Sequence, residues 1–328
     1  MSGWESAGET RRRQDVDSRW AASRGLVRRS KLIVPTNVPR FVDRAHLRGA
    51  DAIMLDLEDS IPAAEKPAAR AALAEAIAKV ARGGADVVIR INKPYDLALA
   101  DLEAAVVPGV DTICLPKAES GREVEMLDAL ISARERARGL PPGAVRLAIT
   151  IESALGLGRV DEILQASARV LTVDVGAEDM TRDLDIEPTR SGHELLVARQ
   201  MVVQAARRAG VQALGMATTL ANYTDLDALR ASISQARELG FRGAGCIHPA
   251  QVGPLNELFA PPAERVERAR RVLAVYDEAL AQGRASAALD GEMIDLPVAE
   301  RARAIVARSD AIAAHDARKQ AALAALEG

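Results

Sequence analysis

Aromatic residues are scarce in this chain of 328 residues, which contains two Trp, three Tyr and three Phe. The core must therefore be built from Ala, Leu, Val and Ile, and platforms on which nucleic-acid bases could stack are largely missing. The formal net charge is −3 and the calculated pI is near 5.9. The chain thus lacks the basic field that nonspecific nucleic-acid binding requires, and nucleic acid is not an expected partner.

Cysteines and long apolar runs are also few. Cys114 and Cys246 each lie in an apolar segment without a CxxC partner, which argues against a zinc or redox motif and predicts two buried hydrophobes. No apolar stretch is long enough to span a membrane, and the N-terminal segment has no apolar signal-peptide core. We expect a soluble cytoplasmic protein with no membrane partner and a polar, disordered tail over residues 1–27.

From Lys31 onward, short aliphatic runs alternate with Ala-rich segments of helical length, such as residues 65–81 and 192–210. This alternation indicates βα units and a parallel sheet. The eight strand candidates are residues 31–35, 52–56, 86–91, 112–116, 146–152, 170–176, 213–218 and 243–248. A doubly wound open sheet is the alternative, but the GxGxxG motif typical of its first turn is absent. We therefore predict an α/β fold, a TIM (β/α)8 barrel, over residues 28–260.

Residues 261–328 lie outside these eight repeats. A charged amphipathic helix is expected over 261–283, a loop over 284–297 and a last Ala-rich helix from about Val298. We predict a C-terminal helical extension that either covers the barrel mouth or packs on a neighbouring subunit.

Polar residues follow most of the predicted strands. In a TIM barrel these positions converge on one small space at the end where the strands terminate. The residues there are Asp56, Glu58, Asp59, Arg90, Lys117, Glu152, Glu178, Asp179 and His248. Their shared position makes them candidates for one active site.

Glu152 and Asp179 follow adjacent strands of the predicted sheet. Two neighbouring carboxylates can bind a hard divalent cation. Mg²⁺ takes oxygen ligands, commonly one or two protein carboxylates with water and substrate oxygens. Arg90 adds a fixed positive charge for a substrate carboxylate or a developing oxyanion. Taken singly, each carboxylate is as consistent with a structural ion pair as with a metal ligand, and His248 is as consistent with a loop histidine as with a functional one.

Several segments carry a resemblance to a known family: RRSKLIVPTN, GADAIMLDLEDSIPAAEK, VVIRIN, CLPKAES, TIESALG, GAEDM, GCIHPAQV and GEMIDLP. In this order and spacing, from about Arg28 to Pro297, they resemble the HpcH/HpaI aldolase/citrate lyase family. Within that family the chain is most similar to acyl-CoA ester lyases related to the citrate lyase beta subunit, of the malyl-CoA or citramalyl-CoA lyase type.

This resemblance implies specific roles. Glu152 and Asp179 would bind Mg²⁺, with Mn²⁺ as an alternative, while Arg90 and Glu152 would bind substrate and Arg90 would contact the reacting oxygens. The GEMIDLP segment implies that Asp295 acts as a catalytic acid in a neighbouring subunit. A homo-oligomer, a trimer or a multiple of it such as a hexamer, follows from that role.

The predicted reaction is Mg²⁺-dependent cleavage or formation of a β-hydroxyacyl-CoA thioester, such as malyl-CoA or citramalyl-CoA. Its products would be a 2-oxo acid and an acyl-CoA, so that CoA belongs to the substrate. Three alternatives remain: a lyase acting on an acyl-carrier protein thioester, a CoA-free aldolase releasing pyruvate or oxaloacetate, and a hydroxyacyl-CoA thioesterase.

Two departures from the family pattern bear on the substrate. Thr36 stands where a glycine is usual, and the run after the seventh strand lacks the usual charges at Gly215, Leu220 and Asn222, which suggests an altered pocket. Arg28, Arg29 and Lys31 are candidates for a CoA phosphate site, although basic residues before a strand more often belong to plain surface.

Overall fold

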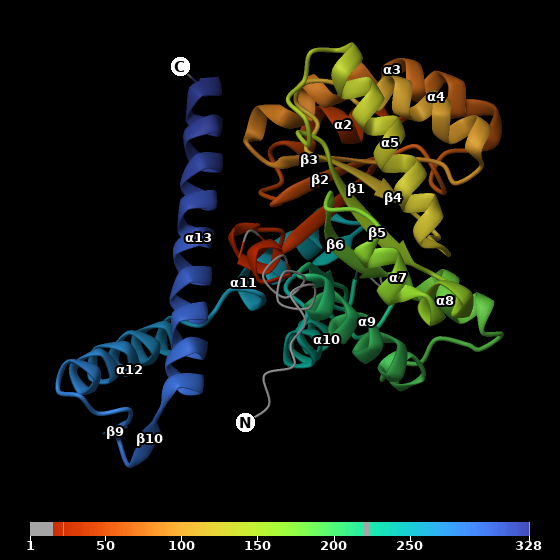
Figure 1. The fold of residues 1–328 in the computed structure, drawn as a ribbon. Coiled ribbons are helices and arrows are strands. Elements are labelled where there is room, and N and C mark those ends of the chain that lie inside the picture. The colour runs from red at the N-terminus through yellow and green to blue at the C-terminus, as the bar shows by residue number, and fades with distance from the viewer. Residues whose placement is uncertain (1–15, 22, 220–223, 328) are drawn as a thin grey trace.

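The computed structural model describes residues 16–21, 23–219 and 224–327. Eight parallel strands form a barrel with helices around it (Figure 1). The strands are β1 (Ser30–Pro35), β2 (Ala52–Asp56), β3 (Asp86–Arg90), β4 (Thr112–Leu115), β5 (Arg146–Ile151), β6 (Val170–Val175), β7 (Gln212–Leu214) and β8 (Ala244–Cys246). Each of the eight expected strands is present and begins within one residue of its predicted start, while β7 and β8 end earlier than expected.

The strands pair in the order β7-β6-β5-β4-β3-β2-β1-β8. Two backbone hydrogen bonds join the ends of this sheet: Gly215 N–H donates to Gly243 O at 2.8 Å, and Arg242 N–H donates to Ala213 O at 3.0 Å. Eight parallel strands closed in this way confirm the predicted TIM barrel.

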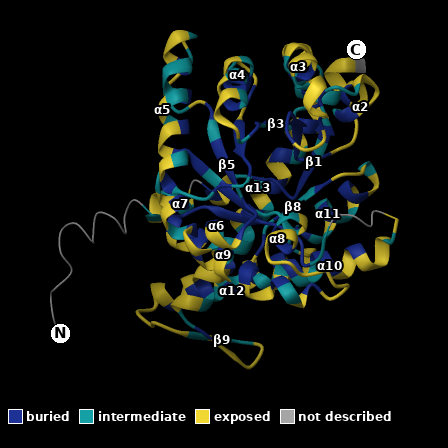
Figure 2. Ribbon diagram, turned by 90° about the vertical axis from the view of Figure 1, so that its right-hand side faces the viewer, coloured by how far each residue is buried: buried dark blue, intermediate teal, exposed yellow. Residues whose placement is uncertain are grey.

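Helices follow the strands and cover the outside of the barrel. They are α2 (Pro39–Ala45), α3 (Lys66–Val80), α4 (Tyr95–Ala105), α5 (Gly121–Ala137), α6 (Ala154–Gly158), α7 (Val160–Gln165), α8 (Ala177–Asp183), α9 (Leu196–Ala209), α10 (Leu226–Leu239) and α11 (Val252–Leu258). Figure 2 shows buried strands at the centre and exposed outer faces on α3, α4 and α5. No helix in the described ranges is long and apolar enough to cross a membrane.

Aliphatic side chains fill the layer between the strands and these helices. A smaller cluster inside the barrel consists of Ala52, Met54, Val88, Cys114 and Ala148. Cys114 and Cys246 are buried and unbonded to each other, as predicted. The core is therefore aliphatic, in keeping with the shortage of aromatic residues.

The C-terminal extension consists of α12 (Ala263–Ala281), the hairpin β9 (Ala287–Leu289) and β10 (Glu292–Ile294), and α13 (Leu296–Glu327). The hairpin was expected to be a loop. Its turn is Asp290–Gly291, with φ of +53° and +80°, the Asp-Gly pair that two-residue hairpin turns favour. Figure 1 shows α12 and the hairpin projecting from the barrel, while α13 runs along it.

Helix α13 packs on the end of the barrel where the strands begin. Buried Asp51, just before β2, pairs with Lys319 Nζ at 2.7 Å and with Arg29 Nε at 2.7 Å, and Arg29 also pairs with Asp316 at 2.6 Å. Burial alone would raise the pKa of Asp51, but the hydrogen bonds from Arg29 and Lys319 outweigh burial and lower it. These ion pairs hold α13 at the end opposite the mouth, so α13 does not cover the mouth. The other expectation, that the extension packs on a neighbouring subunit, stays a prediction.

Residues 16–21 and 23–25 are helical and contact the barrel, although sequence composition placed them in a polar tail. The guanidinium groups of Arg207 and Arg242 lie 4.8 and 5.3 Å from the centre of the Trp20 ring. Arg19 donates to the carbonyl oxygens of Ser167 and Val170, each at 3.2 Å. One aromatic ring and one arginine thus attach this segment to the barrel.

Candidate active site

A cavity of about 520 Å³ opens at the barrel end where the strands terminate. Five of the predicted residues line it: Asp59, Arg90, Glu152, Glu178 and Asp179. The remaining wall includes Lys31, Ile33, Met54, Thr150, Asp174, Gly176, Gly215, Met216, Ala244 and Ile247. The structure therefore brings together the proposed metal ligands and Arg90, as their positions after successive strands predict.

Glu152 directly follows β5 and is the most perturbed acid of the site. Burial, together with a side-chain hydrogen bond to Asp179, raises the pKa of Glu152 to about 8, and Lys117 offsets only part of this rise. Its Oε2 atom is buried and has no hydrogen-bond partner among the described residues. A buried carboxyl group with a raised pKa beside a second carboxylate, and with an unpartnered oxygen, indicates that a positive charge belongs between the two.

Gly176 explains how Glu152 fits. A Cβ atom at position 176 would lie 2.6 Å from Cγ of Glu152 and 2.8 Å from its Cδ. Any side chain there would displace the carboxylate. The glycine of the GAEDM segment therefore makes room for the acid of the preceding strand.

Asp179 lies in the first turn of the short helix α8, which follows β6. Arg182 Nη2 is 2.6 Å from its Oδ1, and Lys117 Nζ is 3.9 Å from its Oδ2. Asp179 thus faces Glu152 on one side and two cations, exposed Arg182 and half-buried Lys117, on the other. Glu178, beside it, lines the cavity but is exposed.

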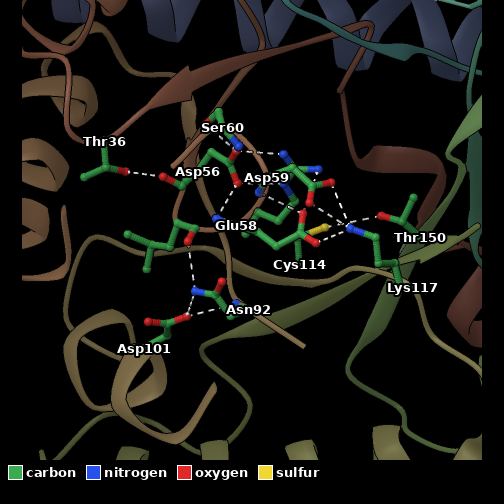
Figure 3. Close-up of polar contacts among 12 residues, drawn as sticks. Thr36, Asp56, Glu58, Asp59, Ser60, Asn92, Asp101, Cys114, Lys117 and Thr150 are labelled. Carbon is green, nitrogen blue, oxygen red and sulfur yellow. Dashed lines mark hydrogen bonds and ion pairs between the residues drawn. The ribbon is translucent and has the colours of Figure 1, made fainter. Parts of the chain in front are cut away.

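Arg90 ends β3 and is held by Asp56 at the end of β2. Arg90 Nε and Nη2 each donate to one carboxylate oxygen of Asp56, both at 2.7 Å, and Nη1 lies 3.3 Å from Glu58. Burial disfavours the charged guanidinium, but Asp56 outweighs it and raises the pKa of Arg90. Asp56 also accepts a hydrogen bond from Ser60 (Figure 3). Asp56 does not line the cavity. It positions Arg90.

Lys117, Glu58 and Asp59 form a cluster at the rim (Figure 3). Lys117 Nζ donates to Glu58 and lies 2.8 Å from Asp59 Oδ2. Burial raises the pKa of Glu58, while for Asp59 the bond from Lys117 outweighs burial and lowers the pKa. Thr36 Oγ1 donates to the backbone oxygen of Asp56 at 2.8 Å, so this departure from the family pattern ties β1 to β2.

Like Asp56, Glu58 and Lys117, the predicted residues His248 and Asp295 do not line the cavity. The Nδ1 atom of exposed His248 accepts from Ala250 N–H at 3.2 Å, which makes this residue a cap of the turn at 249–251. Asp295 precedes α13, where its Oδ1 accepts from Val298 N–H at 3.3 Å, and it does not line the cavity of its own chain.

The candidates for CoA phosphate binding are placed elsewhere. Arg28 is buried at the opposite end of the barrel, where it pairs with Asp86 at 3.0 Å, and Arg29 pairs with Asp51. Neither reaches the mouth. Lys31 points into the barrel and lies 2.9 Å from Asp174. Sequence reasoning missed Asp174, although its place two residues before Gly176 puts it on the inner face of β6. Leu220 and Asn222 lie outside the described residues.

Glu152 and Asp179 are the residues fit to hold a metal ion. Within the described ranges no group of three His, Cys, Asp or Glu side chains is placed to hold a cation. Two carboxylates suffice for Mg²⁺, which keeps water and substrate oxygens as its other ligands. The unpartnered, buried Oε2 of Glu152 is the structural sign that a ligand is expected there.

Fold and site define a class of protein: a TIM barrel with a carboxylate pair and a half-buried arginine at its mouth, suited to metal-assisted chemistry on anionic small molecules. The family model described as HpcH/HpaI aldolase/citrate lyase matches residues 29–249. The chain belongs to this family.

Its relatives are named lyases. The chain is 36% identical to the citrate lyase subunit beta of Leuconostoc mesenteroides subsp. cremoris over 87% of its own length and 94% of the relative's. It is 30% identical to an L-malyl-CoA/beta-methylmalyl-CoA lyase of Cereibacter sphaeroides, over 87% and 96%. These names confirm the prediction of an enzyme of the lyase class.

A solved structure of CitE from Mycobacterium tuberculosis in complex with magnesium, acetoacetate and coenzyme A is similar to the chain as well. It has 28% sequence identity and a TM-score of 0.67, and the match covers 86% of this chain and 97% of that one. The match extends well beyond residues 29–249.

Proposed function

We propose that the chain is a Mg²⁺-dependent carbon–carbon lyase that cleaves or forms a β-hydroxyacyl-CoA, of the malyl-CoA or citramalyl-CoA type. The products are a 2-oxo acid and an acyl-CoA. The observation that carries the proposal is the Glu152–Asp179 pair, with its unpartnered oxygen, in the cavity that Arg90 also lines. The complex of the mycobacterial CitE with magnesium and coenzyme A supports both ligands.

In this proposal Glu152 and Asp179 hold the cation. When bound, Mg²⁺ supplies Lewis acidity toward the oxygens of the oxo-acid half. Arg90 binds a substrate oxygen and stabilises the negative charge that develops as the bond between the hydroxyl-bearing carbon and the thioester α-carbon breaks. Because Asp56 holds both Nε and Nη2 of Arg90, the guanidinium has a fixed direction before substrate arrives.

The carbon that becomes an enolate needs a proton donor, and we assign this role to Asp295 of a neighbouring subunit. Asp295 does not line the cavity of its own chain, which is consistent with that assignment. Mixing Asp295→Ala protein with Glu152→Ala protein under subunit exchange should restore part of the activity that each variant lacks. A monomer in solution, or no recovery in exchanged oligomers, would contradict the assignment across subunits.

The reaction is tested by incubating the protein and Mg²⁺ with a panel of hydroxyacyl-CoAs while free thiol and 2-oxo acid are measured separately. A lyase releases oxo acid without thiol, whereas a thioesterase releases thiol. Release of oxo acid from the free hydroxy acid would instead indicate a CoA-free aldolase.

Citrate lyase beta-like action on an acyl-carrier protein thioester is the second candidate, favoured by the 36% identity to a citrate lyase subunit beta. The same panel with the acyl group on an acyl-carrier protein separates the two. Turnover only with the carrier would replace CoA as the thiol and leave the bond cleavage unchanged.

A further inference from the structure

The floor of the cavity carries an ion pair that the proposed chemistry does not use. Lys31 on β1 and Asp174 on β6 face each other across the barrel, with 2.9 Å between Lys31 Nζ and Asp174 Oδ2. Both side chains are at least nine-tenths buried, and both line the cavity. The neighbouring thiol of Cys114 is neutral, because burial raises its pKa to about 11.

Lys31 and Asp174 can each form further hydrogen bonds. Within the described residues, the structure gives each charged group only the other as a hydrogen-bonding partner. An ammonium group has three donors and a carboxylate several acceptor positions, so both keep unused capacity toward the cavity. An apolar group pressed against the pair would leave these positions unsatisfied, which is unfavourable.

Lys31 and Asp174 together carry no net charge, so a neutral ligand group is favoured beside them. A terminal hydroxyl can accept from Lys31 and donate to Asp174 at once, and it adds no charge. A carboxylate would place a second anion beside Asp174 in a buried space, where like charges repel strongly. The floor therefore matches a neutral donor–acceptor group.

Strand register shows how far the Lys31–Asp174 pair lies below the proposed metal ligands. Asp174 is the register partner of Thr150, which precedes Glu152 by two residues on β5. Two residues of strand span about 6–7 Å, so the floor lies roughly that far below the metal ligands. A substituent of two to four heavy atoms on the oxo acid covers this distance.

The size of the thiol carrier determines which end of the substrate enters the cavity. The bulky thiol carrier must stay outside a cavity of about 520 Å³, so the end directed to the floor is the one distant from the thioester. Once the carboxylate and reacting oxygen of the 2-oxo acid are held near Glu152 and Asp179, its remaining substituent points down the barrel.

We propose that Lys31 and Asp174 determine specificity for a 2-oxo acid half whose substituent ends in a hydroxyl group. This inference rests on the proposed lyase function and names its substrate class more narrowly. Lys31 and Asp174 act here as binding residues for the substituent and take no part in bond cleavage.

The test uses condensation of acetyl-CoA with matched 2-oxo acids in the presence of Mg²⁺. Each pair has a substituent of equal length that ends either in hydroxyl or in methyl: hydroxymethyl and ethyl, 2-hydroxyethyl and propyl, 3-hydroxypropyl and butyl. For at least one length, kcat/KM should be higher for the hydroxyl-ended acid by about tenfold or more. Glyoxylate and pyruvate report on the lyase reaction itself.

The double variant Lys31→Met/Asp174→Ala removes both charges and avoids an unpaired buried one. Its hydroxyl-to-methyl ratio of kcat/KM should fall below one. In Asp174→Asn, which keeps the shape of the floor, the uncompensated Lys31 should shift preference toward a carboxylate-ended acid. Lys79→Met, on the outer surface of α3, is the control and should keep the wild-type ratio.

Different failures have different meanings. Turnover of glyoxylate or pyruvate with no hydroxyl advantage at any length would overturn the specificity inference and leave the lyase function standing. An advantage that persists in both cavity variants would also overturn it. No turnover of any 2-oxo acid would refute the proposed function, and the inference with it.

Discussion

The raised pKa of Glu152 makes a quantitative prediction about the metal-free protein. Burial and the bond to Asp179 raise this pKa from an ordinary 4.5 to about 8. Because the folded pKa lies above the unfolded one, the stabilising contribution of the protonated group is complete below about pH 4.5 and is lost as the pH rises through 8. The gap corresponds to roughly 5 kcal/mol, at about 1.36 kcal/mol per pH unit.

Glu152→Gln removes this titration and keeps the shape of the side chain. In the presence of EDTA, the free energy of unfolding of the wild type should fall by about 3 kcal/mol more than that of the variant between about pH 5.5 and 8.5. The measurement is denaturant unfolding followed by circular dichroism, at one protein concentration for both proteins.

Mg²⁺ supplies the second half of this test. In the wild type it should displace the proton of Glu152 and restore stability at high pH, whereas Glu152→Gln should gain little from Mg²⁺ and show no metal-dependent turnover. An equal pH dependence in the two metal-free proteins would refute the reasoning, because it would show that the carboxyl group of Glu152 does not hold a proton above its ordinary range.

Two further predictions follow from close contacts. Gly176→Ala should lower Mg²⁺ affinity by about 10–100-fold, because its Cβ would displace Glu152, and calorimetry would measure this loss; unchanged affinity would show that the site adjusts freely. Asp51→Asn should destabilise the protein by about 3–5 kcal/mol, since it removes the buried carboxylate that Arg29 and Lys319 share and leaves only half-buried Asp316 to pair with them, while the distant Mg²⁺ site keeps its affinity. Exposed Asp43→Asn is the matched control in thermal unfolding, and an equal change in both variants would contradict the role of burial.

The barrel was predictable because its signals are local. Each strand is a short aliphatic run, and α9 and α10 end at Gly210 and Gly240, which adopt left-handed φ values of +73° and +110°. The site residues were predictable for a related reason: the ends of parallel strands meet, so residues after successive strands converge.

The features that the sequence did not predict depend on contacts between residues far apart in the chain. Arg29 and Asp316 are 287 positions apart, and no local pattern shows that a basic residue before the first strand is buried by the last helix. The sequence suggested only a phosphate contact for Lys31 and no role for Asp174, because these residues are brought face to face only by closure of the barrel. The hairpin at Asp290–Gly291 did have a local signal, the Asp-Gly pair between two short apolar runs, and it was overlooked.

The ion pairs at Asp51 also impose an order on biosynthesis. Arg29 and Asp51 leave the ribosome early, but Asp316 and Lys319 follow only after the whole barrel has been translated. Until α13 has been translated, Arg29 and Asp51 therefore lack the partners that Asp316 and Lys319 provide at the strand-start end of the barrel. We expect the unfinished chain to be less stable at this end during that interval.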